Sequence, residues 1–116
     1  MVDLKSRTKQ FALGVIGLVR AFPRGIEGQV IGRQLLRAAT SVGANYRASQ
    51  RAKSKADFIS KMSTVEEEAD ECCFWLEIAL DAKVVAEELA QPLLGEANEL
   101  TAIVVSAIKT AKANRP

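Results

Sequence analysis

The chain has 116 residues, 48% of them hydrophobic and 26% charged, with a formal net charge of +2 at pH 7. This length favours one domain, and the share of apolar residues excludes an intrinsically disordered chain. Histidine is absent, which removes the commonest general base and the commonest metal ligand.

Helical periodicity dominates the first half of the chain. Asp3 can cap a first helix, expected over about residues 4–22, which Pro23 would then end. The segment "PRGIEG" that begins at Pro23 has turn chemistry and is expected to be a loop. A second helix is expected over about residues 29–50, because small and apolar residues alternate at spacings of four and three: Ile31, Leu35, Ala38, Val42, Asn45 and Ser49.

Two longer helices are expected in the second half. Ser54 can cap a third helix over about residues 55–82, with Asp57 near its positive end. A fourth helix is expected over about residues 87–112, where Pro92 either kinks the helix or marks its start. Four amphipathic helices with short links and no period-2 strand pattern predict an all-α, antiparallel up-and-down four-helix bundle with a single domain over residues 1–116.

Neither apolar runs nor cysteines indicate a special compartment. "FALGVIGLV" has nine residues, whereas a membrane span needs about 20, so this segment is expected to be a core helix with no membrane role. No signal peptide is visible, and the expected location is the cytoplasm. Cys72 and Cys73 diverge by about 100° on a helix, so they are expected to be free thiols that are buried or half-buried.

The charge is divided unevenly along the chain. Residues 1–61 carry a net charge of +9 and residues 62–116 a net charge of −7. On the second helix, Arg33, Arg37, Arg47 and Arg51 fall on one line away from the apolar stripe. This line indicates a solvated face, a face that pairs with neighbouring acids, or a phosphate-binding surface that Lys53 and Lys55 would extend.

The segment "CCFWLEIAL" on the third helix is apolar almost all the way round. A helix that is apolar on every side is expected to be buried on every side, which a monomeric bundle cannot achieve. Its second face therefore predicts a subunit interface with Phe74, Trp75 and Ile78 as anchors and Glu67 and Glu71 beside them. The alternative is an irregular bundle whose other helices cover this turn.

Polar residues do not assemble into a predicted catalytic constellation. Asn45 lies on the apolar stripe, where its amide would need a partner such as Glu68 or Asp57 and would have a structural role. The acids of "EEEADE" crowd one helix and lack histidine partners, which disfavours a metal site. The sequence therefore predicts no enzyme activity, no metal and no cofactor.

Two segments, "LLRAATSVGANYRASQRAKSKADFISKM" and "EEEADECCFWLE", resemble the bacterial four-helix-bundle proteins named for the 23S rRNA intervening sequence. The positions that match this family are Asn45, Arg47, Arg51, Ser54, Asp57, Phe58, Glu68, Ala69, Glu71, Trp75, Leu76 and Glu77. The segment "YRASQRA" departs from the better known branch, which carries a glycine after the Asn segment. The resemblance implies a ring, expected to be a homopentamer, and no known activity.

The same resemblance extends to the accessory variability proteins of diversity-generating retroelements, basic pentamers that work with a reverse transcriptase and nucleic acid. It implies RNA, DNA or a reverse transcriptase as partners if the arginine line is exposed on the ring. The first hypothesis is thus a non-enzymatic oligomer that binds nucleic acid, or a nucleic-acid enzyme, through its cations. The second is a scaffold in which the arginines pair with Glu67, Asp70 and Glu71 of a neighbouring subunit.

Overall fold

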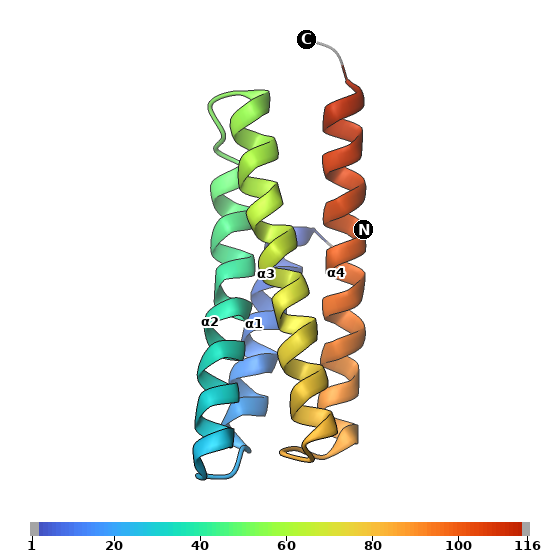
Figure 1. Cartoon of the computed structure of the whole chain (residues 1–116). Helices are drawn as coiled ribbons and strands as arrows, with labels where there is room; N and C mark the ends of the chain where they lie inside the picture. Colours follow the sequence, from blue (N-terminus) through green and yellow to red (C-terminus); the bar gives the residue numbers. More distant parts are fainter. Residues whose placement is uncertain (1–2, 115–116) are drawn as a thin grey trace.

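The computed structural model describes residues 3–114, which form four α-helices (Figure 1). They are α1 (Leu4–Arg20), α2 (Ile26–Ser49), α3 (Lys55–Asp81) and α4 (Glu87–Ala113). Over this described range the chain contains no strand, so the prediction of an all-α bundle of four helices is confirmed. Among these helices, none combines the length and the apolar content that crossing a membrane requires.

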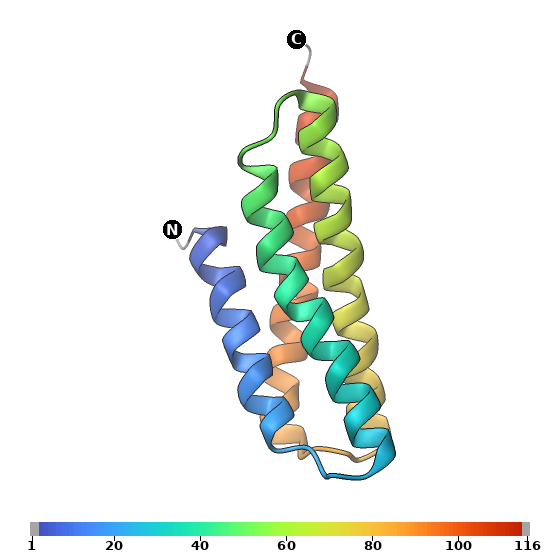
Figure 2. The ribbon, with the colours of Figure 1, turned by 90° about the vertical axis from the view of Figure 1, so that its left-hand side faces the viewer.

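The helices follow one another around the bundle in chain order. Each packs against its neighbours in sequence, and α1 closes the bundle through a smaller contact with α4. The links α1–α2 and α3–α4 lie at one end of the rod, and the link α2–α3 lies at the other (Figure 1). Because α1 is the shortest helix, it begins below the level at which α2 ends (Figure 2). The last turns of α2 therefore have no α1 backbone beside them.

Side-chain caps set the start of two helices. The Asp3 carboxylate accepts a hydrogen bond from the Ser6 N–H at 2.8 Å, and the Ser54 hydroxyl accepts one from the Asp57 N–H at 3.0 Å. Asp57 in turn accepts from the Lys53 N–H at 3.0 Å and from Lys61 Nζ at 2.7 Å. Lys61 and this backbone donor hold the pKa of Asp57 below its usual value. Both sequence-predicted caps are therefore present.

The structure corrects one local expectation and excludes one alternative that the sequence left open. The first is that "PRGIEG" is all loop: α2 begins at Ile26, with Gly25 as its N-cap, so the final three letters are helical. Gly28 permits this early start because its missing side chain leaves room for the Pro23 carbonyl. The second concerns Pro92, which does not mark a helix start, because α4 begins at Glu87 and continues through it.

The core includes five of the six residues of the stripe predicted on the second helix: Ile31, Leu35, Ala38, Val42 and Ser49. Its fully buried large side chains come from every helix: Val15, Leu35, Val42, Met62, Val65, Leu76, Leu100 and Val104. On α4 the last buried residue is Ile108. Small residues in α2, including Ala38 and Ala39, are fully buried, which lets neighbouring helices approach α2 closely.

The α3–α4 link ends α3 with a Schellman motif. Lys83 has a φ of 56°, in the left-handed region, and its N–H donates to the Leu80 carbonyl at 3.1 Å. The Val84 N–H donates to the Ala79 carbonyl at 2.9 Å, and the Val84 side chain packs with Ile31 and Ala79. This small apolar cluster fixes the end of the bundle that lies opposite the α2–α3 link (Figure 1).

Candidate nucleic-acid interface

The arginine line of α2 is divided between two neighbouring helices. Arg37 faces α3, where its Nη2 lies 2.8 Å from both carboxylate oxygens of Glu71 and its Nη1 lies 3.4 Å from Glu68 Oε2. Arg37 and Arg47 differ by about 80° on the helix, which is enough to direct Arg47 to the opposite neighbour, α1. Arg37 lies away from the apolar stripe and is exposed, as expected, but among the alternatives for the line it pairs with neighbouring acids of its own chain.

The ion pair at Arg37 is part of a network on the α2–α3 surface. Trp75 Nε1 also donates to Glu71 Oε1, at 3.4 Å. Burial raises the pKa of Glu71, but the hydrogen bonds from Arg37 and Trp75 outweigh it and leave that pKa below its usual value. Burial and the adjacent Glu71 raise the pKa of Glu68. Arg37 thus compensates two acids of its own chain and contributes little free positive charge to the surface.

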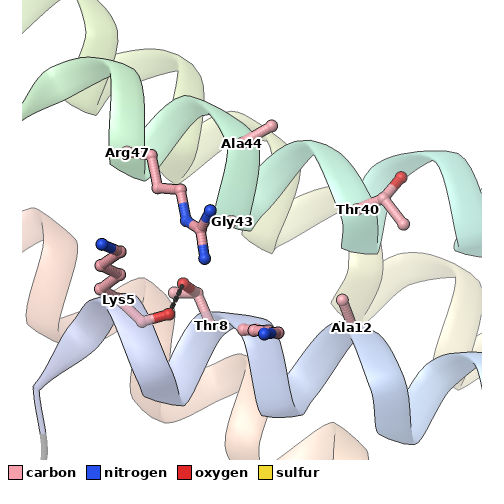
Figure 3. A pocket seen from close by; sticks show the side chains of 8 residues that line it. Lys5, Thr8, Ala12, Thr40, Gly43, Ala44 and Arg47 are labelled. Atoms are coloured by element: carbon pink, nitrogen blue, oxygen red, sulfur yellow. Dashed lines mark hydrogen bonds between the residues drawn. The ribbon is translucent and has the colours of Figure 1, made fainter.

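Arg47 lines an open groove of about 540 Å³ between α1 and α2. The side chain extends from α2 across the groove toward α1, where it faces the turn that carries Lys5 and Thr8 (Figure 3). Lys9 is the third cation of the lining. The remaining lining residues are small or hydroxylated: Thr8, Ala12, Thr40, Gly43 and Ala44. Their small size keeps the space between the helices open.

A set of exposed cations surrounds this groove and the adjacent α2–α3 link. We refer to it as the basic end; its members are Lys5, Lys9, Arg47, Arg51, Lys53 and Lys55. Within residues 3–114, none of these six side chains forms an ion pair. Arg33, the remaining candidate from the line, is also exposed and unpaired in that range but does not line the groove. The basic end therefore carries free charge that α3 does not neutralise.

Lys5 and Lys9 were not among the candidates chosen from the sequence. They lie one helical turn apart, so both project from the same side of α1. A charge pattern on α1 alone resembles an ordinary solvated face. Their convergence with Arg47 depends on how α1 packs against α2, which a helical wheel of one helix does not contain.

The predicted interface anchors on α3 have different environments. Phe74 is 53% exposed and stacks edge-on with Trp75, their ring centroids 4.9 Å apart. Trp75 and Ile78 are partly buried against the core and against the Val84 cluster, so the other helices do cover part of this turn. Glu71 is engaged by Arg37, whereas Glu67 is exposed. Phe74 remains the exposed apolar side chain, with acids on the same face of α3 at helical spacing: Glu67, Asp70 and Asp81.

Other candidate groups are engaged within the bundle. Asn45 donates from Nδ2 to the Ser41 carbonyl at 2.9 Å, so the expectation that Glu68 or Asp57 is its partner is wrong. Cys72 and Cys73 are buried free thiols, and burial raises the pKa of both. Over residues 3–114 no three or more Cys, Asp or Glu side chains are grouped in a way that could hold a metal ion.

The geometry defines a four-helix bundle with a free basic end and an exposed acidic and apolar face. The chain belongs to the 23S rRNA-intervening sequence protein family, whose sequence profile matches residues 2–106. It is similar to a crystal structure of a protein with unknown function from the S23 ribosomal protein family of Bacteroides thetaiotaomicron. The two share 30% identity and a TM-score of 0.85, over 92% of this chain and 99% of that one. No curated protein matches the sequence.

Proposed function

We propose that this protein is a non-enzymatic homo-oligomer that binds nucleic acid through the basic end. The observation that carries the proposal is the group of six exposed cations that no carboxylate of residues 3–114 pairs with. Arginine and lysine side chains that are free of internal partners can replace the counterions of a phosphate backbone. Contacts of this kind position a nucleic acid and carry little sequence information, so the binding is expected to be weakly sequence-specific.

The binding proposal is tested by titrating labelled structured RNA and DNA with the protein at several salt concentrations. Replacing Arg51 and Lys53 by glutamine is expected to weaken binding and to reduce the slope of log affinity against log salt by about 0.9 for each phosphate that the protein no longer neutralises. The matched control removes the α2–α3 ion pair with Arg37→Gln and Glu71→Gln together, which leaves the net charge unchanged. The control is expected to retain both affinity and slope.

Two outcomes contradict the binding proposal. One is an unmodified protein that binds neither RNA nor DNA at low salt. The other is an Arg51→Gln, Lys53→Gln variant whose affinity and salt slope equal those of the unmodified protein. A reverse transcriptase, or another enzyme that carries nucleic acid, is the alternative partner that these cations would bind. It would be identified by whether it co-purifies with the unmodified protein and is absent from preparations of the variant.

We propose that the protein assembles through two different faces of the antiparallel bundle. The Phe74 face of one copy packs against the outer face of α1 in the next copy, and repetition of this contact forms a ring. Glu67, Asp70 and Asp81 lie on the same face of α3 as Phe74, whereas α1 exposes Leu13 and, two turns further along the same face, Arg20. An exposed aromatic residue on an acidic face and an exposed leucine on a face that carries a cation are complementary in polarity and in charge. Because the two faces differ, the contact is head-to-tail, and such contacts close into rings, here expected to be a pentamer.

Phe74→Glu is expected to convert the assembly to monomers, because it places a charge at the centre of the interface among other acids. Light scattering coupled to size-exclusion chromatography measures the mass. Ile26→Glu is the control, since Ile26 is the most exposed of the large apolar side chains, at 80%, and belongs to the first turn of α2 rather than to α1 or α3. A monomeric unmodified protein, or loss of assembly in the control as well, would reject this interface.

A scaffold without nucleic acid is the second candidate function. The exposure of Phe74 favours it, because that face supports assembly without any role for the basic end. Its original form, in which arginines pair with acids of a neighbouring subunit, is weakened at Arg37, whose partners lie in its own chain. An assembled protein with no affinity for RNA or DNA would favour the scaffold.

A further inference from the structure

The α1–α2 groove differs from the rest of the basic end in that its cations converge on one space. Lys5 and Lys9 line it from α1, and Arg47 lines it from α2 (Figure 3). Like charges placed around a common cavity repel one another, and the repulsion is relieved when an anion occupies the cavity. Cations on an ordinary solvated surface do not have to share one cavity in this way.

Acceptors that could neutralise these cations from within the groove are scarce. No carboxylate is among the residues that line the 540 Å³ space. Asp3 lies at the neighbouring rim, where its carboxylate already accepts the Ser6 N–H as the cap of α1. The Thr8 hydroxyl donates to the Leu4 carbonyl at 2.7 Å, within its own helix. Within the described residues, the three cations therefore have no anionic partner in the groove.

The shape of the groove also suits a compact anion. Gly43 on α2 lies opposite Thr8 on α1, and Ala12 and Ala44 also line the groove, so no long apolar side chain fills this part of it. A Cβ atom added at Gly43 would lie 3.6 Å from Thr8 Oγ1, at ordinary contact distance, so steric closeness of the helices does not explain this glycine. Because Gly43 has no side chain, the groove is deeper beneath the Arg47 guanidinium. That planar group can donate two parallel hydrogen bonds to a phosphate, and the lysines can supply point charges beside it.

We infer that the α1–α2 groove is a discrete phosphate-binding site formed by Lys5, Lys9 and Arg47. The inference rests on the proposed function and sharpens it: one phosphate of the nucleic-acid backbone occupies the groove, while the other cations of the basic end act as a diffuse field around it. A small phosphorylated molecule shares the same chemistry and is the second source of the anion.

The test follows the backbone amide chemical shifts of the full chain by NMR during two titrations. One uses inorganic phosphate, and the other uses a short single-stranded oligonucleotide without terminal phosphates, against a chloride control of equal ionic strength. Both ligands are expected to shift the amides of Thr8, Gly43 and Ala44 first. Arg47→Gln is expected to weaken the phosphate response by about tenfold or more, because hydrogen bonds between charged partners are the strong ones. Arg33→Gln, an equal charge change on the same helix outside the groove, is expected to leave it unchanged.

The outcomes separate the groove from the wider proposal. Shifts spread evenly over all exposed cations, or equal losses in Arg47→Gln and Arg33→Gln, would overturn the groove while leaving nucleic-acid binding by the basic end intact. A groove that responds to inorganic phosphate in a protein without affinity for the oligonucleotide, RNA or DNA supports the site and identifies a small phosphorylated ligand as its occupant. It would also reject the proposed function. Absence of any phosphate-specific shift rejects the site directly.

Discussion

Leu76→Ala is expected to lower the free energy of unfolding by about 2–5 kcal/mol. Leu76 is 0% exposed and belongs to the central core cluster, so its removal leaves a cavity that the surrounding helices fill only in part. Because domains of this kind are stable by about 5–15 kcal/mol, the loss is a large share of the total. Denaturant unfolding at one fixed protein concentration measures it.

The matched control for this substitution is Leu13→Ala. Leu13 is 49% exposed on the outer face of α1, so the same change of side chain is expected to alter the free energy of unfolding by no more than about 0.5 kcal/mol in the monomer. Equal losses at the two positions would contradict the assignment of Leu76 to the core. Working at low protein concentration keeps the proposed assembly out of the comparison.

Gly28→Ala is expected to destabilise the protein by about 1–3 kcal/mol. A Cβ atom at this position would lie well inside van der Waals contact with the Pro23 carbonyl oxygen, and backbone cannot rotate away as a side chain does. The link between α1 and α2 would have to shift, or the first turn of α2 would unwind. Thermal and denaturant unfolding measure the change, and a helical content reduced only slightly would place the damage in that first turn.

Gly95→Ala provides the opposite case with the same chemistry. Gly95 is exposed in the interior of α4, and a Cβ atom there would meet nothing within 4 Å. Alanine is expected to stabilise the protein by about 0.5–1 kcal/mol, because it restricts the unfolded chain and favours the helix. If Gly28→Ala were as favourable as Gly95→Ala, the close approach of Pro23 to α2 would be wrong.

Much of the fold could be predicted from sequence because helix signals are local. Caps such as Asp3 and Ser54, and the spacing of Leu35, Ala38 and Val42, depend only on residues within a few turns of one another. The start of α2 was missed because turn-forming letters also fit a helix N-terminus. Whether such residues form a turn or the first turn of a helix depends here on the room that Gly28 leaves for Pro23, which lies outside the helix.

The candidate site was harder to predict, since it depends on which helices are neighbours. A wheel of α2 alone places Arg37 and Arg47 about 80° apart on its outward side but does not say which helix each one meets; in the bundle the first meets acids of α3, and the second lines a groove with lysines of α1. The charge that is free for a partner is therefore decided by contacts between helices. The apolar residues of α3 show the same limit of sequence-based prediction. Phe74 and Trp75 are both apolar in the sequence, but Phe74 is exposed and Trp75 is partly covered by other helices.

The order in which the helices pack also has a consequence for how the bundle folds. Three of its four interfaces join helices that are consecutive in the chain, and only the smallest, between α1 and α4, brings distant segments together. Low contact order of this kind is associated with fast folding, because little loop-closure entropy is lost before contacts form. Docking of α1 on α4, with Arg7 bound to Glu96 through two hydrogen bonds of 2.7 and 2.8 Å, is then the step that closes the cylinder. The groove that we assign to phosphate lies between α1 and α2, so an anion bound there is expected to hold α1 on the bundle and thereby to favour its contact with α4.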